Sequence, residues 1–108
     1  MNNDYFDYLE QLFHDWRYDN PKIMYGIVRA MKPDVVVEVG TYRGYTACFL
    51  AKALQENKKG HLYCIDNFSL HEHVPRYGDP KQHLIDNFNK AGVIDVVTLL
   101  EGNSDEVQ

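Results

Sequence analysis

The sequence predicts an α/β fold built on a doubly wound parallel sheet. Three short apolar runs, at residues 35–39, 61–65 and 94–100, alternate with segments of helical periodicity. The first run, Val-Val-Val-Glu-Val, lacks polar alternation, which is typical of a strand buried on both faces of a parallel sheet. Alternating strands and helices favour right-handed crossovers within one such sheet.

Two helices precede the first run. The first spans residues 4–17, and its apolar residues recur on one helical face: Tyr5, Phe6, Tyr8, Leu9, Leu12, Phe13 and Trp16. The second begins at Asn20-Pro21, a capping residue followed by a proline suited to the first helical turn. It ends at Lys32-Pro33, and its predicted apolar face consists of Ile23, Met24, Ile27, Val28 and Met31. Further helices are expected at residues 44–56 and 81–90, with a polar loop over 67–80.

Length and composition limit the possibilities. The chain has 108 residues, enough for one domain, so 1–108 is expected to be a single domain with N-terminal helices at 1–32 and a βαβαβ unit at 33–108. The net charge of −5 argues against broad binding to nucleic acid or anionic lipid. No apolar stretch approaches the roughly 20 residues of a membrane helix. Cys48 and Cys64 form no metal-like or redox-like pair, so a reduced, cytoplasmic protein is expected.

The segment from Glu38 to Gly44, Glu-Val-Gly-Thr-Tyr-Arg-Gly, joins the first strand to a helix. Ligands of doubly wound sheets bind beyond the carboxyl ends of the strands. Gly40 permits a tight exit and Gly44 a close backbone approach, although both could be simple turn glycines. A dinucleotide site expects G-x-G-x-x-G, whereas Tyr42 stands at the second glycine position. Glu38 would repel a pyrophosphate and suits a cationic ligand such as a sulfonium or ammonium group.

The run VVVEVGTYRGYTACFLAKAL resembles motif I of the class I S-adenosylmethionine-dependent methyltransferases, in particular their small-molecule O-methyltransferase-like branch. HLYCID ends in an acidic residue, as that family's second motif does, and LLEGNSDEV is similar to its adenine-pocket segment. The resemblance implies a Rossmann-like fold, S-adenosyl-L-methionine as cofactor, and methyl transfer to an oxygen or nitrogen of a small molecule.

The resemblance also implies roles for individual residues. Glu38 would lie near the methionine end of the cofactor, while Gly40, Thr41 and Gly44 would shape the loop against its methionine and ribose portions. Asp66 would accept hydrogen bonds from the ribose hydroxyls, as a carboxylate at a strand end can, although it could instead be a cap. The remaining cofactor contacts would come from residues after the second and third strands: Asn67, Phe68, Asn103 and Ser104.

No metal site is expected. His71 and His73 are two residues apart in a loop and lack the i, i+4 spacing of the helical zinc motif. The aromatic face of the first helix is expected to pack in the core, and a homodimer through it is a further prediction carried by the resemblance.

The family's sheet has seven strands in the order 3-2-1-4-5-7-6, and this chain supplies three. We therefore expect a fragment, with the first strand left as an edge and no catalytic base that can be named. Two alternatives remain. One is a non-catalytic, methyltransferase-like binding module, and the other is a fragment of an NAD-dependent oxidoreductase.

Overall fold

The computed structural model of the chain describes residues 3–13, 21–41, 44–67 and 79–102. Helices and strands alternate as the sequence predicts, and no helix in these ranges is long and apolar enough to cross a membrane. The elements, in chain order, are α1 (Asn3–Leu12), α2 (Pro21–Met31), β1 (Val35–Val39), α3 (Tyr45–Asn57), β2 (His61–Asp66), α4 (Pro80–Ala91), the 3₁₀ turn η3 (Ile94–Val96) and β3 (Val97–Glu101).

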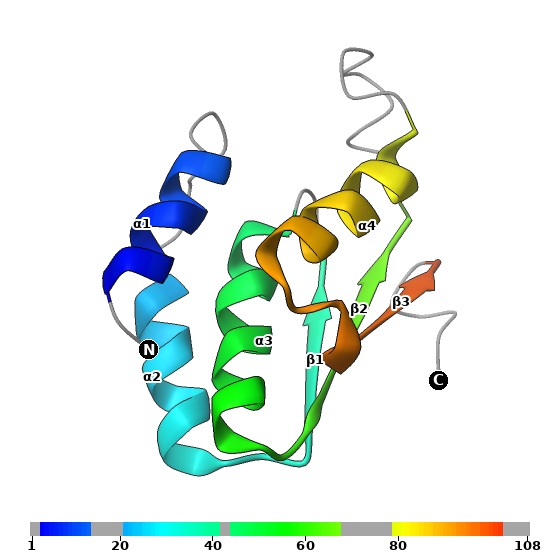
Figure 1. Ribbon diagram of the computed structural model, residues 1–108. Helices are drawn as coiled ribbons and strands as arrows, with labels where there is room; N and C mark the ends of the chain where they lie inside the picture. Colours follow the sequence, from blue (N-terminus) through cyan, green and yellow to red (C-terminus); the bar gives the residue numbers. More distant parts are fainter. Residues whose placement is uncertain (1–2, 14–20, 42–43, 68–78, 103–108) are drawn as a thin grey trace.

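The three strands form one parallel sheet in the order β1-β2-β3, so β2 is central. Val35 pairs with His61 at one end of the β1–β2 ladder, and Asp66 pairs with Glu101 at the far end of the β2–β3 ladder. The strands point in the same direction, which brings their carboxyl ends to one edge of the sheet (Figure 1). The predicted fold class is confirmed, and within the described residues β1 is an edge strand, as expected.

The helices α3 and α4 cover one face of this sheet (Figure 1). Both crossovers run in the same direction along the sheet, and right-handed crossovers of that kind place their helices on the same face. Every second strand residue joins the core on that face: Val36, Leu62, Cys64, Val97 and Leu99. On the other face, His61 lies beside Tyr63 and hydrogen bonds to Thr98.

The prediction that β1 is buried on both faces is therefore wrong for the described residues. Val35, Val37 and Val39 are 58%, 56% and 60% exposed, and they belong to the face opposite α3. The sequence run is apolar on both faces, but the described helices cover only one of them.

The N-terminal helix α1 packs against α3. Leu9 and Phe13 are fully buried, and the Phe6 ring stacks on Phe49 with centroids 5.1 Å apart. The hydroxyl of Tyr5 donates to the Ala91 carbonyl at 2.7 Å, near the end of α4 where helix carbonyls lack intrahelical partners. Most of the described part of this predicted face thus packs in the core, whereas Tyr8 is 41% exposed and Trp16 lies outside the described residues.

Two predicted features need correction. The helix α2 packs on α3 through Val28 and Tyr25, whereas the rest of its predicted apolar face is exposed: Ile23, Met24, Ile27 and Met31. The third strand begins at Val97 rather than residue 94, because Ile94–Val96 form a 3₁₀ turn.

Gly60 makes the tight connection into β2. Its φ is +97°, and a Cβ at this position would lie 2.4 Å from the Pro33 carbonyl oxygen and 2.7 Å from Leu54 Cδ2. A backbone oxygen cannot move aside as a flexible side chain can, so only glycine fits here.

We expect Gly60→Ala to lower the free energy of unfolding by about 2 kcal/mol or more, the scale of local backbone strain. The matched control is Gly26→Ala in α2, where a Cβ meets nothing within 4 Å and alanine favours the helix by about 1 kcal/mol. Urea denaturation of both variants measures the difference. Equal stability of the two variants would contradict this account of Gly60.

Candidate functional site

Glycines from the two outer strands hold the end of β2. Gly40 follows β1 with φ of +79°, and its N–H donates to the Ile65 carbonyl at 2.8 Å. Gly102 follows β3, and its N–H donates to the Asp66 carbonyl at 3.0 Å. The backbone that presents Asp66 is therefore bonded from both sides at the carboxyl edge of the sheet.

Asp66 is the acidic residue that the sequence analysis singled out at this edge. It is only 6% exposed, although it is the last residue of its strand, whereas the following Asn67 is exposed. A carboxylate has several acceptor positions, so one at a strand end can accept from two neighbouring hydroxyl groups of a ligand in addition to partners in the protein.

The exit from β1 is a turn between two glycines in left-handed conformation. Gly44 has φ of +91°, and its N–H donates to the Thr41 carbonyl at 3.0 Å. Thr41 is 5% exposed, and its hydroxyl lies beside the Cys64 thiol, for which it is a hydrogen-bond partner. A hydroxyl can both donate and accept, so this turn also offers a buried hydrogen-bonding group to a polar ligand atom.

The packing against α4 also requires glycine at position 44. A Cβ there would lie 2.7 Å from Leu84 Cδ1 and 3.0 Å from Phe88 Cε1, so the turn approaches α4 closely. A close approach to a ligand or a strand was predicted for Gly44, whereas the close neighbours that the structure shows are side chains of α4.

Glu38 points toward the helix layer, because its neighbours in the strand, Val37 and Val39, belong to the opposite face. The negative charge of its carboxylate affects the pKa of two buried thiols, one on α3 and one on β2. Burial and then the charge of Glu38 raise the pKa of Cys48, and the same two causes raise the pKa of Cys64 to about 12. Both thiols are free and buried.

The helix α3 begins immediately after this turn. Its N-cap is Gly44, and no side chain caps the first turn. The N–H groups of a helix start favour anionic groups, so this end of α3 suits a carboxylate on a ligand.

Three of the predicted cofactor-contacting residues fall in segments outside the described ranges, as does the loop with the two histidines. Phe68, Asn103, Ser104 and the two loop histidines, His71 and His73, lie outside the described residues. The remaining predicted site residues lie together at the carboxyl edge of the sheet or one to two residues before it: Glu38, Gly40, Thr41, Gly44, Asp66 and Asn67.

One buried polar residue was missed. Asn87 on α4 is 2% exposed, and its amide nitrogen lies 3.3 Å from the Nε2 atom of His83. The signal was present, since Asn87 interrupts the apolar face that Leu84, Phe88 and Ala91 share.

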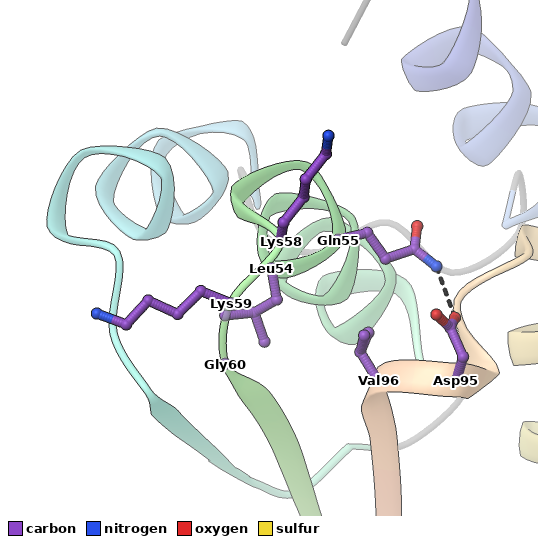
Figure 2. Close-up of a pocket in the computed structure, with 7 residues that line it drawn as sticks. All are labelled: Leu54, Gln55, Lys58, Lys59, Gly60, Asp95 and Val96. Atoms are coloured by element: carbon purple, nitrogen blue, oxygen red, sulfur yellow. Dashed lines mark hydrogen bonds between the residues drawn. The ribbon is translucent and has the colours of Figure 1, made fainter.

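A pocket of about 440 Å³ lies near the amino ends of β2 and β3 (Figure 2). Gly60 and Val96, which line it, precede β2 and β3, and a hydrogen bond from Gln55 to Asp95 crosses one wall (Figure 2). None of the predicted site residues lines this pocket.

A parallel α/β sheet with glycine turns and a buried carboxylate at its carboxyl edge is typical of the doubly wound α/β class, whose ligands bind at that edge. Within that class, a family model described as "Methyltransferase domain" matches residues 37–108. The chain belongs to this methyltransferase-domain family. No curated protein matches the chain.

Solved methyltransferases share the fold at low sequence identity. The O-methyltransferase TomG of Streptomyces achromogenes, solved with S-adenosylmethionine and involved in tomaymycin synthesis, matches with a TM-score of 0.67 and 18% identity over 99% of this chain and 46% of its own. A Geobacter sulfurreducens methyltransferase matches with a TM-score of 0.65 and 20% identity, over 95% and 51% of the two chains. The Podospora anserina methyltransferase PaMTH1, solved with S-adenosylhomocysteine, matches with a TM-score of 0.65 and 21% identity. This match covers 94% of this chain and 41% of PaMTH1. The chain thus spans about half the length of these proteins.

The buried thiols predict a loss of stability at high pH. The pKa of Cys64 is raised in the folded chain from 9.0 to about 12, so an unfolded chain ionises this thiol first. The preference of the folded chain for the protonated Cys64 thiol therefore contributes fully to the free energy of unfolding below pH 9. This contribution is lost as the pH rises toward 12. Urea titrations at pH 8 and pH 10 test this, and Cys64→Ala should show the smaller change between them. An equal change in both proteins would contradict the assignment.

Proposed function

We propose that this chain supplies the cofactor-binding half of an S-adenosylmethionine-dependent methyltransferase. The observation that carries the proposal is the buried Asp66 carboxylate, held at the sheet edge by hydrogen bonds from Gly40 and Gly102 to the end of β2. Membership of the methyltransferase-domain family and a fold shared with cofactor-bound methyltransferases support it.

The residues at the edge fit the chemistry of S-adenosylmethionine. Asp66 would accept hydrogen bonds from the ribose hydroxyls, and the Thr41 hydroxyl offers a buried polar partner. The uncapped start of α3 suits the carboxylate of the methionine portion, while Glu38 beside the turn provides negative charge toward the cationic portion. Gly40, Gly44 and Asn67 would complete the described contacts, and Phe68, Asn103 and Ser104 are proposed to add contacts near the adenine.

When bound, S-adenosylmethionine would supply an activated methyl group on a sulfonium. The protein would bind the cofactor, orient it along the sheet edge and exclude water from it. Alignment of donor and acceptor at about 3–3.5 Å is a proximity effect that lowers the barrier. We name no catalytic base and propose no metal. The proposed acceptor is an oxygen or nitrogen of a small molecule, since a structural neighbour is an O-methyltransferase of tomaymycin synthesis.

A second candidate function is a non-catalytic module that binds the cofactor or a partner. It is favoured by the length of the chain, which spans only about half of its structural neighbours. Binding without methyl transfer to any acceptor would select this candidate. The oxidoreductase alternative is set aside, because the family model is a methyltransferase domain.

Two further proposals concern the cellular location of the protein and its oligomeric state. The free, buried cysteines support a reducing, cytoplasmic location. A homodimer through α1 would have to use its outer surface, because Leu9 and Phe13 are fully buried within the chain.

We expect Asp66→Ala and Gly40→Val each to weaken S-adenosylmethionine binding at least tenfold, equal to about 1.4 kcal/mol. The first substitution removes the acceptor, and the second places a β-branched residue at a φ of +79°. Isothermal titration calorimetry with S-adenosylmethionine and S-adenosylhomocysteine measures the effect, with NAD as the ligand control.

The matched control is Asp34→Asn, which changes an exposed carboxylate at the amino end of β1. Its 3.5 Å ion pair with Lys59 is exposed, and such pairs contribute little to stability. Unchanged affinity in folded Asp66→Ala protein would refute the role of Asp66.

A further inference from the structure

Five aromatic side chains form a continuous row that joins α2, α1 and the start of α3. The Tyr25 ring of α2 meets the Phe6 ring edge-on with centroids 5.4 Å apart, and Phe6 stacks on Phe49 of α3 at 5.1 Å. Phe49 meets Tyr45 edge-on at 5.4 Å, and Tyr45 packs against Phe13 at the same distance. Aromatic pairs at this spacing stabilise a structure beyond the area that they bury. The row therefore reaches the first residue of α3, directly after the turn of the candidate cofactor site.

The start of α3 depends on packing rather than on a local cap. Its N-cap is Gly44, and no side chain caps the first turn. The first bond within the helix runs from the Cys48 N–H to the Gly44 carbonyl at 2.9 Å. A side-chain cap ordinarily stabilises a helix start, so here the neighbouring elements have to hold it.

Two helices hold this start from different directions. Side chains of α4 approach the backbone of the turn, with Leu84 and Phe88 closest to Gly44. From the other direction, the Phe13 ring packs on Tyr45, and both residues are buried. Figure 1 shows the end of α1 at the same end of the molecule as the start of α3 and the tips of the strands. The first turn of α3 is thus supported by α4 and by the end of α1.

The Phe13 ring is presented from an anchored helix. The Tyr5 hydroxyl donates to the Ala91 carbonyl at 2.7 Å, and the Tyr8 hydroxyl donates to the Lys90 carbonyl at 2.8 Å. Helical bonding continues to the end of α1, because the Phe13 N–H donates to the carbonyl four residues earlier at 3.0 Å. The position of Phe13 is therefore fixed by contacts other than its own contact with Tyr45.

We propose that Phe13 is a positioning residue for the cofactor site. Its ring holds Tyr45 and thereby orders the first turn of α3, whose N–H groups suit the carboxylate of the methionine portion. A turn that is ordered before binding reduces the ordering entropy that the cofactor has to offset. This role rests on the proposed function, and it extends the site to a helix that precedes the sheet.

The first test compares two phenylalanines of the same helix. Phe13→Leu removes the ring that packs on Tyr45, whereas Phe6→Leu removes the ring that stacks on Phe49, about one turn further along α3. Isothermal titration calorimetry should show S-adenosylmethionine binding weakened about fivefold by Phe13→Leu, the scale of one aromatic pair, and by less than about twofold by Phe6→Leu. Phe13→Met, a second variant that keeps an apolar side chain without the ring, should behave as Phe13→Leu does.

Hydrogen exchange tests the ordering of the helix start without cofactor. Phe13→Leu should speed exchange of the Cys48 amide, which makes the first bond of α3, more than exchange of the Leu54 amide in its second half. Phe6→Leu should change both amides to the same extent, as a general loss of stability does. An equal change of both amides in Phe13→Leu would overturn the positioning role.

A double-mutant cycle tests whether Phe13 acts through Tyr45. Once Tyr45→Leu has removed the partner ring, Phe13→Leu should weaken S-adenosylmethionine binding no further. Losses of affinity that add in the double variant would show that the two residues act independently and would overturn the proposal.

The titration of the unaltered chain separates this role from the proposed function. Absence of binding by the folded, unaltered chain would overturn the proposed function and this role together. Binding by that chain which Phe13→Leu and Phe6→Leu weaken equally, in protein with a native circular dichroism spectrum, would overturn the role of Phe13 alone.

Discussion

The central position of β2 is the constraint on which the rest of this structure depends. Parallel pairing on both sides fixes the register of β1 and β3, and it therefore decides which residues reach the carboxyl edge together. The same pairing continues past the strands, where Gly40 and Gly102 bond back to the last carbonyls of β2. Asp66 is thus presented from a backbone with no freedom to slide, and a ligand gains affinity from such preorganisation.

Much of the fold and part of the site could be predicted because the signals are local. Glycine after a strand marks an exit that needs positive φ, and both Gly40 and Gly44 adopt it. The helix α4 begins with Asp79 as its cap, whose side chain accepts from the Lys81 N–H, and ends at Gly92 in left-handed conformation. An acidic residue at the end of a central strand also needs no tertiary information to be noticed.

The orientation of apolar faces could not be predicted in the same way. The helix α2 carries more apolar residues than one contact can bury, and the sequence does not say that Val28 and Tyr25, rather than the Ile23–Ile27 side, pack on α3. The run in β1 is equally ambiguous, since its composition fits a fully covered strand while the helices of the described chain cover one face. Gly44 shows the same limit, because its close neighbours Leu84 and Phe88 lie 40 and 44 positions further along the chain.

The candidate cofactor site and the open edge of the sheet both involve β1. This strand leads directly into the turn of the candidate cofactor site, yet within the described chain it is paired on one side only. An edge strand opens locally at lower free-energy cost than a central one, and Gly40 and Thr41 follow β1 directly. Whatever covers the open edge would therefore stiffen Gly40 and Thr41 without touching them, and would reduce the ordering entropy that a cofactor has to offset. The open edge of β1 and the turn of the candidate cofactor site are accordingly parts of one strand and its exit.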